Sequence, residues 1–192
     1  MLTKTHRMIA SNIIVNISTG NKDIIDEKNF IKGNLKPDNI SMYKLKKHYK
    51  DESFAMIISK IHFLSSLSKQ EILTTYGKKR FNQELGVVCH FLCDYFCMAH
   101  HERWEFKNKF KRHVQYEVVL GRMAENYRYN SYKNMNIDIA KVADFINAML
   151  IEYNTVKGFE ADIIFAQYVC NSVVNTVLQR VKVNTAFGAL AV

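Results

Sequence analysis

Residues that interrupt regular secondary structure are scarce in this chain, which has one proline and seven glycines among 192 residues. Because proline and glycine mark most turns, their scarcity argues against a fold of many short strands. The hydrophobic fraction of 48% is too high for a disordered chain and ordinary for a globular one. The length suits a single domain. We therefore expect one compact, multi-helix, all-α domain over residues 1–192.

Cysteines and long apolar runs are also few. Of the four cysteines, Cys89, Cys93 and Cys97 lie one helical turn apart and cannot bridge distant loops, which fits a reducing compartment. We interpret them as small apolar packing residues, since thiolate metal sites usually present cysteine from loops or turns. No apolar stretch approaches the roughly 20 residues that span a bilayer, and no signal peptide is visible. We expect a cytoplasmic protein as the sequence stands, or a secreted one if a signal peptide has been removed.

Apolar periodicity predicts helices over 5–18, 53–67, 106–130, 137–153 and 158–181. Residues 69–100 are expected to form one long helix or two stacked ones. Ser53 and Asp138 are the predicted N-terminal caps. The stretch 19–52 is rich in turn residues, so we expect it to be irregular, and residues 184–192 should form a tail.

Within the predicted long helix, polar side chains that can bind metal interrupt the apolar segment HFLCDYFCMAHH. His90 and Asp94 are four residues apart and share one helix face. His100 lies well off that face at about 100° per residue, so it more naturally serves a neighbouring ion. His113 and Glu117 form a second same-face pair soon afterwards. Burying such groups without partners costs about 2 kcal/mol or more each, so we infer a metal site.

Several other signatures are absent. The chain has no Glu-x-x-His pair of the ferritin-like di-iron bundles, no His-Glu-x-x-His of the zinc proteases and no His-Asp dipeptide. It also has no Walker-type phosphate loop and no Gly-x-Ser-x-Gly nucleophile motif. These absences leave the paired His-x-x-x-acid pattern as the main chemical signal.

The order and spacing of this pattern resemble the zinc-dependent phospholipase C family, which includes secreted bacterial enzymes and the catalytic domain of a clostridial alpha-toxin. Single-strand-specific zinc nucleases share its fold and metal site. The family has His-x-x-x-Asp, a His six residues later, and then His-x-x-x-Glu, and here these positions are His90, Asp94, His100, His113 and Glu117. Its earlier Thr-His, Pro-Asp and His-aromatic motifs correspond to His6, Asp38 and His48. The similarity covers roughly residues 5–120.

The resemblance implies an all-helical cleft that holds two or three zinc ions. The first ion would be held by Asp38, His48, His90 and Asp94. The second would be held by His100, His113 and Glu117. A third would lie between His6 and Asp94, with Asp94 bridging it to the first. Nitrogen and oxygen donors of this kind suit catalytic zinc, which activates a water for attack on a phosphodiester. Asp38 would also position or deprotonate that water.

The chain departs from the family at two points. Secreted members begin with a Trp whose amino group and carbonyl complete the third zinc site, whereas here Met-Leu-Thr-Lys-Thr precedes His6. The resemblance therefore leaves the third zinc without that ligand. The aromatic residue that contacts choline after Pro-Asp is replaced by Asn39, which removes the basis for expecting specificity for phosphatidylcholine.

Three functions remain open from the sequence. The first is a zinc-dependent phospholipase C that cleaves phospholipid during transient contact with a membrane surface. The second is the same chemistry on single-stranded nucleic acid or a nucleotide, for which the net charge of +9 and the candidate stacking residues Tyr43, Tyr49 and Trp104 are suitable. The third is a non-catalytic member in which metal ions only hold helices together.

Overall fold

The structure is a computed structural model that describes residues 1–17, 19–39, 48–104, 110–127, 135 and 137–190, and within them it is helical without strands. The α-helices are α1 (Thr3–Asn16), α2 (Glu27–Asn39), α4 (Lys50–Ser66), α5 (Lys69–Leu73), α6 (Lys78–Tyr95), α7 (Met98–His101), α8 (Phe110–Asn126), α9 (Val142–Val156) and α10 (Phe159–Leu190). Two short 3-10 turns are η1 (Thr19–Asn21) and η3 (Ile139–Lys141). The all-α fold class is confirmed.

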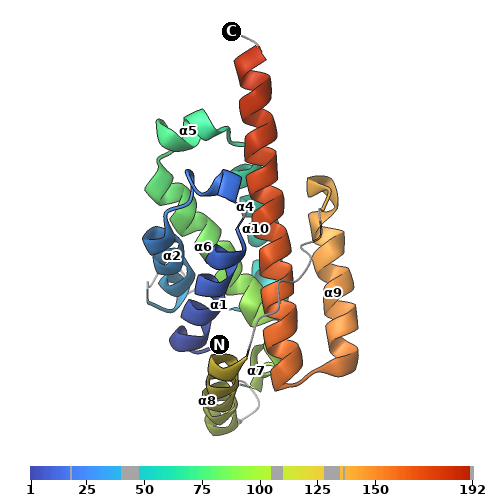
Figure 1. Cartoon of the computed structure of the whole chain (residues 1–192). Coiled ribbons are helices and arrows are strands. Elements are labelled where there is room, and N and C mark those ends of the chain that lie inside the picture. Colours follow the sequence, from blue (N-terminus) through green and yellow to red (C-terminus); the bar gives the residue numbers. More distant parts are fainter. Residues whose placement is uncertain (18, 40–47, 105–109, 128–134, 136, 191–192) are drawn as a thin grey trace.

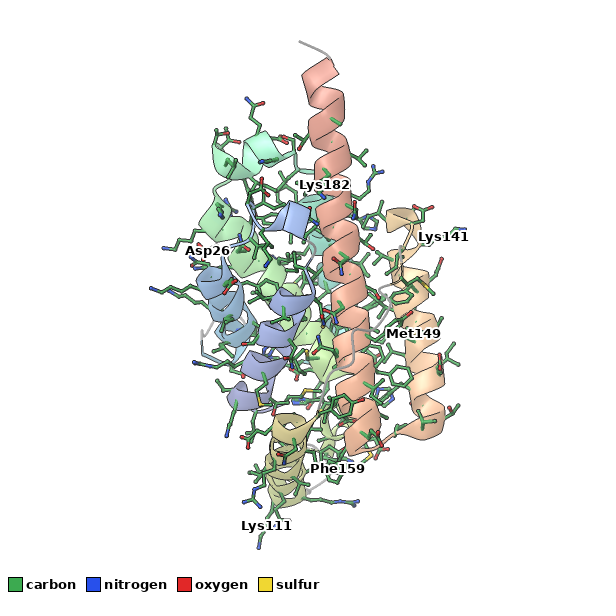
Figure 2. The ribbon with its side chains drawn as sticks, viewed as in Figure 1. Asp26, Lys111, Lys141, Met149, Phe159 and Lys182 are labelled. Carbon is green, nitrogen blue, oxygen red and sulfur yellow. The ribbon has the colours of Figure 1, made fainter. Side chains whose placement is uncertain are left out.

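Helix α10 is the longest helix and runs along most of the molecule, with α9 on one side and α1, α2 and α6 on the other (Figure 1). Its contacts extend to α4, α6, α9, α1, α8 and α5. Side chains fill the space between α9 and α10, where Met149 packs against the core (Figure 2). A helix surrounded in this way is apolar on most of its circumference.

Two expectations about this last helix were wrong. We expected no stretch long and apolar enough to span a bilayer, but Phe159–Ala186 has the length and hydropathy to cross a membrane. Most of it is buried inside the protein, as in the core helix of a globular domain. The helix also continues to Leu190 instead of ending at residue 181. Asn184 donates to the carbonyls of Ser65 and Leu67, and Thr185 accepts a hydrogen bond from the backbone N–H of Lys69, so contacts distant in sequence hold the first of these extra turns.

The region 19–52 was expected to be irregular, yet it contains helix α2. Gly33, Asn34 and Pro37 are turn-type residues, and all three lie inside this helix. Proline is tolerated because it lies near the carboxyl end, and tertiary packing against α6 outweighs the weak local propensity. This region therefore contributes a packed helix to the site.

The predicted helix over 69–100 is divided into α5, α6 and α7. Ser68 and Glu71 form a capping box that starts α5, and Gly77 precedes α6 at a φ of 93°, which favours glycine. Helix α6 ends at Tyr95, so His100 belongs to a separate helix. Because of this break, His100 can turn toward the face of α6 that carries His90 and Asp94.

The two predicted caps have different outcomes. Asp138 accepts a hydrogen bond from the backbone N–H of Ala140 at the start of η3, which confirms it as a cap. Ser53 is not a cap, because α4 already begins at Lys50. Its hydroxyl instead donates to the carbonyl of Tyr49 and lies 2.7 Å from the Tyr95 hydroxyl. Residues 105–109, at the start of the predicted helix 106–130, lie outside the described residues.

Helices α2 and α6 cross with their backbones in contact, and glycine permits this approach. A Cβ added at Gly33 would lie 2.1 Å from the carbonyl oxygen of Gln83, and one at Gly86 would lie 2.2 Å from that of Phe30. No ordinary side chain fits at either distance. The close crossing brings the carbonyl of Asn34, the residue after Gly33, within reach of α6.

We predict that Gly86→Ala lowers the free energy of unfolding by about 3 kcal/mol, because the two backbones must separate to admit a methyl group. Urea denaturation measures the change. Gly121→Ala in α8 is the matched control, since its Cβ would meet only the Thr5 hydroxyl at 3.2 Å. That control should change stability by no more than about 1 kcal/mol. Equal losses in the two variants would contradict the close α2–α6 contact as the cause.

Candidate metal centre

The structure brings all eight predicted ligand residues into one buried region. They come from α1, α2, the segment before α4, α6, α7 and α8, and they are His6, Asp38, His48, His90, Asp94, His100, His113 and Glu117. The chain has seven histidines, and five of them are in this group. His62 is exposed on α4, and His101 packs edge-on against Tyr153 outside the group.

The carboxylate of Asp94, 1% exposed, is the centre of the first cluster. Its Oδ2 lies 2.8 Å from His48 Nδ1 and 3.2 Å from His90 Nε2. Asp38 Oδ1 lies 3.6 Å from the same His90 nitrogen. Burial raises the pKa of the Asp38 carboxyl. The sequence-based separation of this set from His100 therefore corresponds to a real cluster of donors.

A backbone carbonyl orients His90. The ring Nδ1 lies 2.7 Å from the carbonyl oxygen of Asn34, and because a carbonyl only accepts, Nδ1 carries the proton. The lone pair is then on Nε2, which faces Asp94. Hydrogen bonds of this kind typically set the tautomer of a metal-binding histidine. No sequence signal marks Asn34 for this role, because the contact depends on the close α2–α6 crossing.

His6 extends the first cluster from α1. Its ring stacks on His90 with centroids 4.0 Å apart, and its Nε2 lies 3.2 Å from Asp94 Oδ1. It is fully buried, and neither ring nitrogen has a hydrogen-bond partner among the described residues. Burial lowers the pKa of His6 to about 3, so the ring is neutral and keeps a lone pair. An orphaned, neutral imidazole facing a carboxylate fits a metal ion as its missing partner.

The second cluster joins α7 to α8. Glu117 Oε1 lies 2.9 Å from His100 Nε2 and 3.0 Å from His113 Nε2. Burial alone would raise the pKa of Glu117, but the Met1 ammonium and the two histidines hold it well below its usual range. His100 Nε2 is also 3.7 Å from Asp94 Oδ1, so the two clusters are neighbours. His100 therefore lies with Glu117 and His113, and its binding of a second ion stays a prediction.

A cation lies between the two clusters, and sequence reasoning missed it. The amino group of Met1 is 2.5 Å from Asp94 Oδ1, 2.9 Å from His100 Nε2 and 3.0 Å from Glu117 Oε1. Burial would lower the pKa of this amino group, but the two carboxylates raise it well above its usual value. Its contacts show that the surrounding donors stabilise positive charge. Together with the nitrogen and oxygen donors of His6 and Asp94, these surrounding donors fit a divalent zinc ion.

A cavity of about 500 Å³ adjoins the metal centre. On one side it is lined by the ligand residues His48, Asp94 and His100. Its other walls include Arg103 and, from α9, Leu150 and Ile151. Arg103 is held by Asp51 at 2.9 Å and lies over the ring of Tyr49 at 4.8 Å. The cavity thus lies between candidate metal ligands, a cation and an α9 wall in which Leu150 and Ile151 stand beside Asn147 and Asn154.

A buried carboxylate on α10 holds the helix that carries His100. Asp162 accepts hydrogen bonds from the Tyr153 hydroxyl at 2.6 Å, the Tyr116 hydroxyl at 2.9 Å and the backbone N–H of Met98 at 3.0 Å. One side chain therefore connects α7, α8, α9 and α10. Burial outweighs these donors and raises the pKa of Asp162 to about 7.

We predict that Asp162→Asn becomes more stable relative to the unchanged chain as pH rises from about 4 to 7. In that range the folded protein keeps the Asp162 proton, whereas the unfolded chain has released it. The stability that the protonated Asp162 gives the unchanged chain at low pH is therefore lost as pH rises through the folded-state pKa. The relative gain should reach at most about 4 kcal/mol. Urea denaturation of metal-free protein across this range measures it. Glu160→Gln, exposed on the same turn, should show no such trend, and a flat difference for Asp162→Asn would refute the assignment.

A comparison with protein families gives a match. The family described as "Zinc dependent phospholipase C" matches residues 5–159. The match extends beyond the resemblance expected over residues 5–120 and includes α9. No curated protein and no solved structure matches the chain.

Proposed function

The chain belongs to the zinc-dependent phospholipase C family, and from this premise we propose that it is a phospholipase C. It would hydrolyse the phosphodiester of a phospholipid and release diacylglycerol and a phosphorylated headgroup. The observation that carries this proposal is the convergence of eight candidate nitrogen and oxygen ligand residues beside a cavity whose α9 wall includes apolar side chains. The family supports zinc-dependent phospholipase activity in general, and the specific reaction is our proposal.

The donors divide between two main ions. Asp38, His48, His90 and Asp94 would hold the first, and His100, His113 and Glu117 the second. His6 and the second oxygen of Asp94 offer a third position, so we propose two or three zinc ions. The carboxylate oxygens of Asp94 and Glu117 lie 2.8–3.2 Å from their histidine nitrogens, so each carboxylate and its histidines face one common position.

Zinc bound there supplies a water of lowered pKa and offsets negative charge on the phosphoryl oxygens. The carboxylate of Asp38, 28% exposed, is the accessible base of the first cluster. It would orient the attacking water and accept its proton at the carboxylate oxygen that does not bind zinc. Attack forms a bond from that water oxygen to phosphorus and breaks the bond from phosphorus to the glycerol oxygen. The proton then passes to the leaving oxygen, which completes diacylglycerol.

The walls of the cavity favour a lipid. Leu150 and Ile151 supply apolar surface, and Ile151 is 71% exposed at the molecular surface. Lys50 and Arg103 supply positive charge for a phosphate. An apolar wall beside a cationic one suits a molecule with a charged head and apolar chains. We propose that this side of the protein makes transient contact with a membrane surface.

The nucleic-acid alternative has weaker support. Of its candidate stacking residues, Trp104 is buried and donates its indole N–H to Glu102 at 3.0 Å. The ring of Tyr49 is buried and covered by Arg103. Neither offers a free face on which a base could stack. Tyr43 lies outside the described residues.

We predict that the purified chain contains at least two zinc ions, measured by metal analysis of the protein as isolated. His90→Ala should reduce the zinc content and lower phospholipid hydrolysis about 100-fold or more, because it removes a ligand of the first cluster. His62→Ala, at the exposed histidine, should leave both unchanged. Fewer than one zinc ion per chain would refute the metal centre, and full activity in His90→Ala would refute catalysis at this site.

We also predict that the zinc-loaded chain cleaves phospholipid vesicles and leaves single-stranded DNA intact. Parallel assays of phosphate-ester release and DNA degradation, each repeated with His90→Ala, measure this preference. DNA cleavage that requires His90 would favour the nuclease. Activity on neither substrate, with the zinc content normal, would favour a non-catalytic member.

A further inference from the structure

The structure separates Cys97 from the other three cysteines. Cys93 Sγ lies 3.7 Å from Cys170 Sγ, whose thiol donates to the carbonyl of Cys89 at 3.5 Å. These three are core packing residues, as their small apolar character suggests. The thiol of Cys97 is equally buried, yet it has no hydrogen-bond partner among the described residues.

Cys97 lies next to the second cluster. Its Sγ, a ring nitrogen of His100 and a carboxylate oxygen of Glu117 all lie within 4.8 Å of one another, and all three residues are buried. Tetrahedral bonds of 2.0–2.3 Å place donor atoms about 3.3–3.7 Å apart, so a small inward movement would let one ion contact all three. Of these three donors, the family motif includes the histidine and the glutamate but not the cysteine.

The backbone explains why the thiol faces this way. Helix α6 ends at Tyr95, and Cys97 has an extended conformation (φ −112°, ψ 117°) immediately before α7. It therefore lies at a bend between helices, which is a typical place for a thiolate ligand. The sequence-based interpretation assumed that Cys97 continues the helical stripe of Cys89 and Cys93. The bend removes the reason for treating it as one of them.

We propose that the thiolate of Cys97 binds the second ion together with His100, His113 and Glu117. A sulfur–metal bond would form as the thiol loses its proton to solvent. The proposal rests on the metal centre of the proposed function and is independent of the substrate. It makes the second site chemically different from the first, which has only nitrogen and oxygen donors.

The difference predicts metal selectivity. Thiolate is a soft donor that favours zinc, cobalt and cadmium over magnesium, calcium and manganese, which prefer oxygen. The second site should therefore prefer zinc, cobalt and cadmium even where the first site accepts magnesium, calcium or manganese. Of the second-site residues, His100 lines the cavity, so this site also borders it.

Cobalt substitution tests the proposal. Cobalt(II) bound by thiolate has an intense near-ultraviolet charge-transfer absorption that nitrogen and oxygen ligands do not produce. The metal-free chain titrated with cobalt should develop this band, Cys97→Ser should lose it, and Cys93→Ser, at an equally buried cysteine one turn away, should keep it. Cys97→Ser should also weaken binding of one zinc ion about tenfold or more and leave the other unchanged.

The unchanged chain provides a second measurement that does not depend on how the variants fold. Zinc X-ray absorption should detect a sulfur scatterer at about 2.3 Å. Cobalt binding without the band, together with a zinc shell without sulfur, would overturn the role of Cys97 and leave the proposed function standing. A chain that binds neither metal would overturn both. The band without phospholipid hydrolysis would support Cys97 and contradict the substrate alone.

Discussion

The buried carboxylate of Asp94 is the interaction on which the rest of the site depends. It is almost inaccessible to water, and taking a charge out of water is costly unless partners surround it. Its partners come from the chain terminus, α1, the segment before α4, α6 itself and α7. Burying this one charge therefore requires elements distant in sequence to meet at one point, which is also the requirement for a multi-ion centre.

The helical framework meets that requirement through two close contacts. The glycine-mediated crossing of α2 and α6 places a carbonyl against His90 and fixes its ring. On the other side, Asp162 of α10 accepts three hydrogen bonds that hold α7 against α8 and α9. Neither the two glycines nor Asp162 belong to the candidate ligands. They act by holding in place the helices that carry those ligands. Much of the fold thus serves to position a small number of donor atoms.

The electrostatics of the centre agree with its proposed chemistry. Two carboxylates have pKa values held well below their usual range, and His6 is kept neutral by burial. Anionic oxygens and neutral imidazoles are the protonation states in which these residues bind zinc. The net charge of +9 is a separate property that favours contact with phosphate-bearing surfaces in general. It does not distinguish a lipid from a nucleic acid, whereas Leu150 and Ile151 in the α9 wall of the cavity, beside Asn147 and Asn154, offer apolar contact to a lipid.

The sequence by itself determined the all-α class and the order of the eight candidate ligands. The fold class follows from few helix-breaking residues, and the pairs His90/Asp94 and His113/Glu117 follow from a spacing of four residues on one helix face. The positions of His6, Asp38 and His48 came from the resemblance to the zinc-dependent phospholipase C family. Tertiary structure alone decided that residues 27–39 are helical, that α6 ends before Cys97, and that Asn34 and Asp162 support the site. Each depends on contacts between residues far apart in the chain, such as His90 with Asn34. A local pattern cannot reveal such contacts, because it does not specify which helices will pack together.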